Sequence, residues 1–210
     1  MIVINLKNYK QGDDLFDLVK KIELYYNKAI VAVPPIYLRE AVKSTTLDIF
    51  SEHTDFHEPG KATGYTTPES VAWAGAHGSL LNHSEHKVSF TNIRKTIKRC
   101  NELGLKLIIC VSSLKEAEQI KKLNPYAIAY EDKKLIATGK SITQFDSSEL
   151  KKFVEILKDT EVLPLCGSGI TNEGDVAAAL ILGCKGVLVA SAIANSQNPE
   201  KFLKEASRLF

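Results

Sequence analysis

Short apolar runs recur along the 210-residue chain, and they constrain its fold more than any other feature. Most of these runs contain β-branched residues, and their lengths are typical of strands buried on both faces of a sheet. The runs are Ile2–Asn5, Ala29–Val33, Leu47–Phe50, Ser79–Leu81, Leu105–Val111, Ala127–Tyr130, Val162–Cys166 and Gly186–Val189. We therefore expect eight buried strands.

The segments between these runs have helical periodicity, with apolar residues three or four positions apart, as in Leu15, Leu18, Val19 and Ile22. Helix start signals agree: Ser113 with Glu116 and Asp146 with Glu149 fit capping boxes, and proline follows a capping residue in Thr67-Pro68 and Asn198-Pro199. Gly104, Gly183 and Asn124-Pro125 mark helix ends.

Strict alternation of strand and helix predicts a parallel sheet with right-handed crossovers. Eight strands match a closed (β/α)8 TIM barrel, and a doubly wound open sheet is the alternative. No linker-like segment divides the chain, so we expect residues 1–210 to form one barrel domain.

Composition excludes several classes of function. The formal net charge of +2 gives no reason to expect nucleic acid as a partner, and no apolar run has the length of a membrane span. Cys100, Cys110, Cys166 and Cys184 are scattered without CxxC spacing, which favours reduced buried thiols over disulfides or a metal site. We expect a soluble protein of the cytoplasm.

In either architecture, function concentrates just past the carboxyl ends of the strands. Lys7 follows the first strand there, although most lysines at a surface are merely solvated. His83 and Glu85 follow the fourth strand, beside an expected helix start that would keep the imidazole neutral and able to polarise a carbonyl; a structural histidine is the alternative. Glu131 leaves the sixth strand directly, and because a carboxylate is costly to bury without a use, it is the best candidate general base.

Three later segments are suited to phosphate. Residues 132–140 lie between the sixth strand and its helix. They are predicted to form a movable lid, and an ordinary exposed loop is the alternative. Gly167-Ser168-Gly169 and Ala190-Ser191 follow the last two strands as small turns, where free main-chain N–H groups hold phosphate in many barrels.

Taken in this order, Asn5-Leu6-Lys7, His83-Ser84-Glu85, Ala129-Tyr130-Glu131 with its 137–140 loop, and Gly167-Ser168-Gly169 resemble the motif set of the triosephosphate isomerase family. The likeness covers nearly the whole chain. Leu80–Glu85 and Leu165–Ile170 are similar to the archaeal branch, whose chains are shorter than the bacterial and eukaryotic ones.

This resemblance implies an aldose-ketose isomerase that interconverts dihydroxyacetone phosphate and D-glyceraldehyde 3-phosphate in glycolysis and gluconeogenesis. It implies that Glu131 is the base, that His83 is the electrophile at the carbonyl oxygen, and that Lys7 stabilises the negative enediolate. Asn5 would position the substrate. Glu85 would pair with Lys7 or help to move protons, and a purely structural ion pair is the alternative.

The resemblance also implies that phosphate is held by main-chain N–H groups, near residues Ile136, Ala137, Gly169, Ala190 and Ser191. It implies no metal and no organic cofactor, because protein donors stabilise the enediolate.

Residues 58–64 resemble the family loop that reaches into a neighbouring subunit. The likeness implies a homodimer or homotetramer, with Thr63 near Asn5 and Lys7 of the other copy.

Three positions depart from the family pattern: Asp132 stands in place of a hinge proline, Ala137 in place of a phosphate-binding glycine, and Ser84-Glu85-His86 lacks an arginine. The departures leave two other readings open. One is a phosphate-binding barrel with another reaction, such as an epimerase or an amino-sugar phosphate isomerase of tryptophan or histidine synthesis. The other is a catalytically weak barrel that binds a phosphate ligand or acts as an assembly partner.

Overall fold

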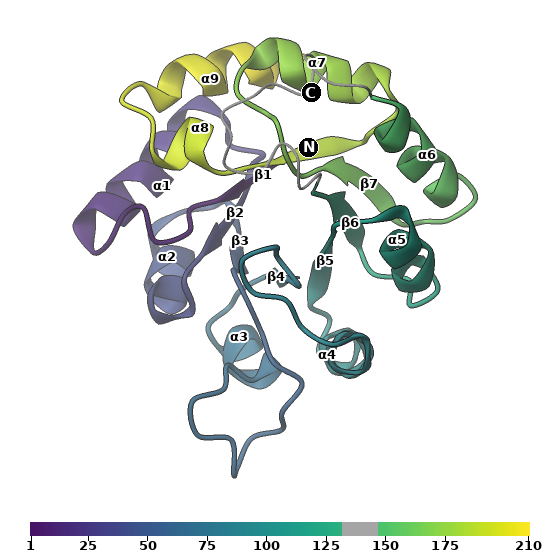
Figure 1. Ribbon diagram of the computed structural model, residues 1–210. Helices are drawn as coiled ribbons and strands as arrows, with labels where there is room; N and C mark the ends of the chain where they lie inside the picture. Colours follow the sequence, from purple (N-terminus) through teal and green to yellow (C-terminus); the bar gives the residue numbers. More distant parts are fainter. Residues whose placement is uncertain (132–146) are drawn as a thin grey trace.

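Eight parallel strands close into a barrel in this computed structural model, which describes residues 1–131 and 147–210. The strands lie in chain order around the barrel (Figure 1), and β8 pairs with β1. They are β1 (Ile2–Asn5), β2 (Ile30–Val33), β3 (Asp48–Ser51), β4 (Gly78–Leu81), β5 (Lys106–Val111), β6 (Ala127–Tyr130), β7 (Leu163–Cys166) and β8 (Gly186–Val189). The predicted closed barrel is confirmed, and the open doubly wound sheet is wrong.

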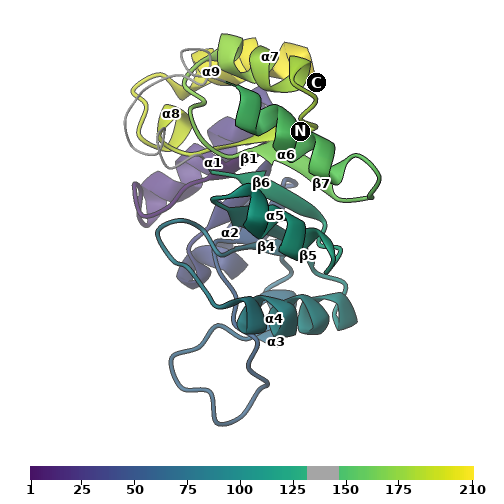
Figure 2. The same ribbon diagram turned by 45° about the vertical axis from the view of Figure 1, so that its right-hand side comes forward.

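Helices cover the outside of the barrel (Figure 2). They are α1 (Asp13–Tyr25), α2 (Leu38–Ser44), α3 (Pro68–Trp73), α4 (Phe90–Glu102), α5 (Leu114–Lys121), α6 (Ser148–Leu157), α7 (Glu173–Ile181), α8 (Ser191–Ala194) and α9 (Pro199–Ala206), with the 3-10 turns η1 (Pro35–Tyr37) and η3 (Ser207–Leu209). Among the described residues, no helix is long and apolar enough to cross a membrane.

Most predicted helix caps are confirmed. The side chains of Thr67 and Asn198 accept hydrogen bonds from main-chain N–H groups at the starts of α3 and α9, each with proline at the first helical position. Ser113 caps α5 in the same way, but the Glu116 carboxylate accepts from the N–H of Ser112 at 2.7 Å, one residue before the cap, so the reciprocal half of that box is absent. Asp146 lies outside the described residues.

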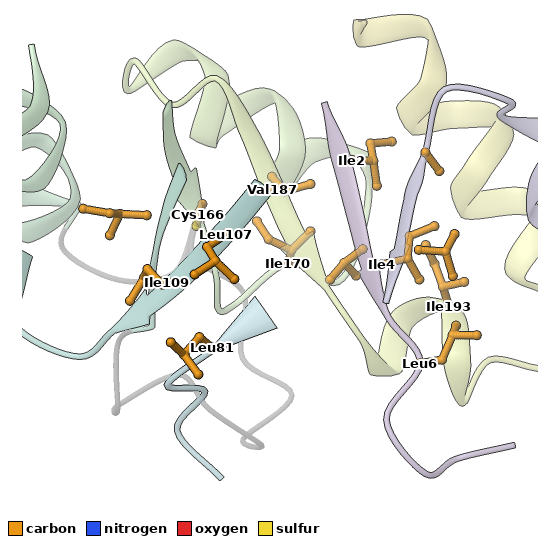
Figure 3. Packing of buried hydrophobic residues seen from close by; sticks show 14 of the residues in the cluster. Ile2, Ile4, Leu6, Leu81, Leu107, Ile109, Cys166, Ile170, Val187 and Ile193 are labelled. Carbon is orange, nitrogen blue, oxygen red and sulfur yellow. The ribbon is translucent and has the colours of Figure 1, made fainter. Parts of the chain in front are cut away.

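Alternating strand residues build two separate cores. Outward-facing residues such as Ile4 pack under the helices, and Figure 3 shows part of this cluster, with Ile4 of β1 and Ile193 of α8. Inward-facing residues fill the barrel itself: Val3, Ile30, Ala32, Phe50, Leu80, Ile108, Cys110, Ala127, Ala129, Leu165 and Leu188. The barrel is therefore a packed core and not a pore.

The inward-facing pattern continues past the strands at their carboxyl ends. Asn5, Glu52, Asn82 and Glu131 each stand two residues after an inward-facing core residue, namely Val3, Phe50, Leu80 and Ala129. Because successive side chains of a strand alternate between its two faces, these polar groups form the next layer above the apolar filling. That layer is the floor of the candidate site.

The segment between β3 and α3 projects away from the body of the molecule in both ribbon views (Figures 1 and 2). Its base is closed by main-chain and side-chain hydrogen bonds between Asp55 and Thr66, with N···O distances of 2.7 and 2.9 Å. We call residues 58–64 the protruding loop; all of them are exposed except the half-buried Ala62.

Cys100, Cys110, Cys166 and Cys184 are buried and form no disulfide, as predicted.

Candidate active site

A histidine and a glutamate meet above the carboxyl end of the barrel. The Nε2 atom of His83 lies 3.0 Å from Oε1 of Glu131, and the other carboxylate oxygen of Glu131 accepts from the main-chain N–H of Ser84 at 2.8 Å. The Glu131 side chain is only 2% exposed and that of His83 14%. The two residues that the sequence singled out on different strands are thus brought into direct contact.

The charge state of this pair follows from its burial. Burial raises the pKa of Glu131 to about 7, against the stabilising hydrogen bond from Ser84. Burial, followed by the nearby charge of Lys7, lowers the pKa of His83 to about 4. At neutral pH the imidazole is therefore uncharged, as predicted, and the carboxyl group is close to half ionised.

The reason predicted for the neutral imidazole is wrong. No helix begins at His83: a turn closed by the His86 N–H on the His83 carbonyl follows, and α4 begins only at Phe90. Burial and Lys7 replace the expected helix dipole as the cause.

One ring nitrogen fixes the tautomer of His83. Its Nδ1 faces the main-chain N–H of Glu85 at 3.2 Å and must accept that proton. The single proton of the neutral ring is then on Nε2, the atom that faces Glu131. His83 is thereby prepared as a hydrogen-bond donor.

Asn82 anchors the turn that carries His83. It is fully buried, its φ is +61°, and its Nδ2 donates to the Cys110 carbonyl and to Oε1 of Glu116, both at 2.7 Å. Its Oδ1 accepts from the N–H of Val88 at 3.0 Å. Lys87 Nζ lies 3.3 Å from the same Glu116 oxygen, so this turn has a cation of its own although the arginine of the family pattern is missing.

Lys7 lies beside this pair and is held by a carboxylate. Its Nζ lies 2.7 Å from Oε1 of Glu85, whose other oxygen is 3.8 Å from Nδ1 of His83. The Lys7 backbone has a φ of +48°, and its N–H donates to Oδ1 of the buried Asn5 at 3.0 Å. Because the left-handed conformation is costly for a lysine, the geometry of Lys7 is imposed by its surroundings.

Several of these groups line one cavity of about 650 Å³, but Asn82 and Glu131 are not among its lining residues. Its wall includes Asn5, Lys7, His83 and Glu85 from the expected site, together with Glu52, which the sequence reasoning missed. Residues 64–66, at the end of the protruding loop and just beyond it, line its outer side.

The expected phosphate-binding turns follow adjacent strands. β7 and β8 pair in parallel, so Gly169 and the Ala190-Ser191 turn leave the same end of neighbouring strands. Gly169 has a φ of +69°, and α8 begins at Ser191 without a side-chain cap. Asp132, Ile136 and Ala137 lie outside the described residues.

Gly167 allows β7 to pass close to Glu131. A side chain there would place its Cβ 3.0 Å from the Tyr130 carbonyl oxygen and 3.1 Å from Cγ of Glu131. The glycine therefore leaves room for the Glu131 side chain.

Glu52, Asn82 and Cys110 are the site residues that sequence reasoning did not find. Glu52 follows β3 as Glu131 follows β6, so the same rule of a carboxylate leaving a buried strand applies to it. Cys110 faces the barrel interior below Glu131, and burial together with that carboxylate raises the pKa of its thiol.

Comparison with known proteins identifies the family of the chain. The family model described as triosephosphate isomerase matches residues 1–206. Curated triosephosphate isomerases that resemble the chain include those of Cenarchaeum symbiosum (33% identical, covering 99% of this chain and 96% of the relative) and Thermoplasma volcanium (35% identical, covering 96% of each). The crystal structure of triosephosphate isomerase from Bartonella henselae shares the fold, with a TM-score of 0.75 at 18% identity over 97% of this chain and 96% of that one. The chain belongs to the triosephosphate isomerase family.

Proposed function

We propose that His83, Glu131 and Lys7 are the catalytic residues with which this triosephosphate isomerase interconverts dihydroxyacetone phosphate and D-glyceraldehyde 3-phosphate, and that residues 1–210 act as one catalytic domain. The observation that carries the proposal is the 3.0 Å contact between Nε2 of His83 and Oε1 of Glu131. It joins a proton donor to a base, and enolisation next to a carbonyl needs both.

Glu131 moves the proton between the two adjacent carbons. A base works best when its pKa is close to the working pH, and burial brings the pKa of Glu131 to about 7. Because the carboxylate is hydrogen-bonded to Ser84 and His83 in the free chain, it must exchange these contacts for the substrate C–H as the reaction begins. Gly167 leaves the space for that rotation.

His83 and Lys7 stabilise the oxygen charge that develops. The Nε2–H of His83 donates to the carbonyl oxygen, and a neutral donor is suited to an enediolate because it can give its proton and take it back. Lys7 supplies fixed positive charge beside it, and the 2.7 Å ion pair with Glu85 restrains its ammonium group. The side chain of Asn5 fixes the main chain of Lys7 by accepting a hydrogen bond from the Lys7 N–H.

The phosphate of the substrate is bound by main-chain N–H groups of Gly169, Ala190 and Ser191, with Ile136 and Ala137 contributing from the 132–146 segment. Support comes from the adjacency of β7 and β8 and from the uncapped start of α8, since the first N–H groups of a helix have no acceptor within it.

A coupled spectrophotometric assay with glyceraldehyde 3-phosphate, run with chelator present, tests the proposal. We expect turnover that falls by several orders of magnitude in Glu131→Gln and strongly in His83→Gln, while both variants still bind phosphate ligands. Glu118→Gln, on the exposed face of α5, and His77→Gln, at the opposite end of β4, are the matched controls and should be unaffected. Wild-type protein without turnover, or turnover that persists in Glu131→Gln, would contradict these roles.

The protruding loop is proposed to enter the same cavity in a second copy of the chain. Cavities of about 300–1,000 Å³ hold drug-sized ligands, and a triose phosphate is much smaller, so it leaves most of the 650 Å³ unfilled. In a dimer with twofold symmetry, the exposed loop of each copy can enter the cavity of the other copy. Thr63 would then lie near Asn5 and Lys7 of the partner, in a homodimer or homotetramer.

Substitution at the loop tip tests this assembly. Thr63 is exposed in the single chain, so Thr63→Arg should leave folding intact while it weakens association in sedimentation experiments and lowers turnover. Asn27→Arg, which is also exposed but precedes β2 at the other end of the barrel, is the control. Unchanged association in Thr63→Arg would refute the exchange of loops.

We also propose that the enzyme works in the cytoplasm. Four free buried cysteines support this assignment, because proteins of oxidising compartments commonly pair theirs. Fractionation of the native cells with an activity assay would test it.

A further inference from the structure

Glu52 is a buried carboxyl group that the reaction as described does not use. It follows β3 directly, its N–H continues the sheet by donating to the Val33 carbonyl at 3.0 Å, and its side chain lines the same cavity as Lys7 and His83. Its Oε1 is shielded from solvent and has no hydrogen-bond partner within residues 1–131 and 147–210. A carboxylate oxygen left in this state carries a desolvation cost that a hydrogen bond or a proton would remove.

The groups around Glu52 carry both signs of charge. One cation, Lys7, is shared with the carboxylate of Glu85, and the Glu85 oxygen already lies 2.7 Å from the ammonium group. The other titratable side chains on the described cavity wall are His53, Asp55, Tyr65, His83 and His86. Asp55 is 3.2 Å from Nε2 of His53, and the His53 ring stacks on His86 at 4.2 Å between centroids, so these three groups interact chiefly with one another.

Together these interactions keep Glu52 protonated at pH values well above those at which a glutamate normally loses its proton. Burial raises its pKa to about 7, the negative charge of Glu85 acts in the same direction, and the N–H and charge of Lys7 oppose them only in part. A second copy whose loop entered the cavity would remove more water and favour the neutral form further.

We propose that Glu52 is a positioning residue that acts as a neutral acid beside Lys7, so that the site takes up one proton from solvent at Glu52 when it binds its phosphorylated substrate. An ionised Glu52 would compete with the substrate anion for Lys7, which Glu85 already neutralises in part. Protonated Glu52 does not compete for the ammonium group of Lys7, which can then bind the substrate anion. Its O–H can also donate a hydrogen bond in the cavity. No bond of the substrate changes in this step. The inference rests on the proposed binding of triose phosphate at Lys7.

The expected signature is in KM and not in kcat. If only the protonated form binds substrate well, the apparent affinity falls with the fraction of protonated Glu52. With a pKa of about 7, that fraction falls about tenfold between pH 6 and pH 8. The wild-type KM should therefore rise about tenfold over this range, relative to a variant that is always neutral.

Glu52→Gln is that variant, because it keeps the shape and the hydrogen-bonding capacity without the charge. The ionisation of the substrate phosphate also changes with pH, but it affects both proteins equally and can be corrected for. After this correction, we expect the KM of Glu52→Gln to stay constant from pH 6 to pH 8. Glu85→Gln is the comparison, because the hydrogen bond and charge of Lys7 hold the pKa of Glu85 below its usual value although burial opposes them. This variant should still show a KM that rises with pH, whatever its rate, with the midpoint moved to lower pH because the Glu85 charge no longer raises the pKa of Glu52. The measurements should be made at a protein concentration at which sedimentation shows the same oligomeric state at every pH.

A second measurement does not depend on kinetics. Calorimetric titration with glycerol 3-phosphate at pH 8, in two buffers of different ionisation enthalpy, counts protons taken up on binding. Wild-type protein should take up close to one proton more than Glu52→Gln. Parallel KM profiles or equal proton uptake in the two proteins would overturn the role of Glu52 alone, and so would loss of the slope in Glu85→Gln. Absence of wild-type turnover of glyceraldehyde 3-phosphate would instead overturn the proposed function.

Discussion

Asn82 offers a direct test of how the His83 turn is held. Replacing it with alanine removes three hydrogen bonds at a fully buried position: those to the Cys110 carbonyl and Glu116 at 2.7 Å, and that from the Val88 N–H at 3.0 Å. Replacing it with glycine removes the same three. The two variants differ in the backbone, because φ at this position is +61°.

The cost of each variant can be worked out from these contacts. Three net hydrogen bonds are worth about 3 kcal/mol, and the buried groups left unpaired add to this, so both variants should lose roughly 3–5 kcal/mol of unfolding free energy. Alanine carries a further cost of about 1–2 kcal/mol in the left-handed region, offset by about 0.4–1 kcal/mol for its smaller chain entropy in the unfolded state. We therefore expect the alanine variant to be the less stable, by roughly 0.5–1 kcal/mol.

Urea unfolding of both variants measures the difference. Asn124 provides the control, since it has a φ of +48° in the exposed turn before β6, and its substitutions report the backbone effect without these buried hydrogen bonds. Turnover should fall in both Asn82 variants because the turn that orients His83 is loosened. An alanine variant as stable as the glycine variant, or a loss below about 1 kcal/mol in either, would refute the reasoning.

Three further predictions concern the Glu131 pair and the barrel interior. Because the base must be ionised, kcat/KM should fall about tenfold per pH unit below the pKa of about 7, with no further change from His83 until the pH approaches 4; a flat profile between pH 5 and pH 7 would contradict this. Burial raises the pKa of Glu131 from its ordinary value of 4.5 to about 7 in the folded state, so the folded protein loses stability relative to the unfolded chain as the pH rises through this window. Glu131→Gln should therefore be more stable than wild type by roughly 2–4 kcal/mol at pH 8 and equal to it near pH 4, as measured by denaturant unfolding. Phe50→Ala should lose about 3–5 kcal/mol in the same assay because Phe50 is fully buried inside the barrel, and a loss under about 1 kcal/mol would mean that the interior collapses onto the space.

Much of the fold was predictable because buried strands and amphipathic helices leave local patterns. β1, β6 and β8 have the bounds that their apolar runs predict. β4 begins one residue before its predicted start, at Gly78, which has no side chain to signal a strand. Gly78 is required by packing between strands, because a Cβ at this position would lie 2.7 Å from the Phe50 ring of β3. No local sequence pattern reveals such a contact.

Lys7, His83 and Glu131 were singled out because each follows a strand and because together they resemble the family motif set, and the structure places all three at one end of the barrel. The neutral state of His83 was predicted for the wrong reason, since the helix expected beside it begins at Phe90 and burial lowers its pKa instead. Asn82 was treated as part of a motif and not as an anchor, because its partners at Cys110 and Glu116 come from another strand and helix.

The register of the barrel strands joins the catalytic floor to the apolar filling. Asn5, Glu52, Asn82 and Glu131 stand directly above Val3, Phe50, Leu80 and Ala129 on the same strands. A substitution that enlarges or shrinks one of those four supports tilts the strand end that carries a functional group. Stabilising variants sought in this layer will therefore alter turnover as well, whereas residues of the outer cluster that lie on the helices, such as Ile22, can be repacked with less effect on the strand ends.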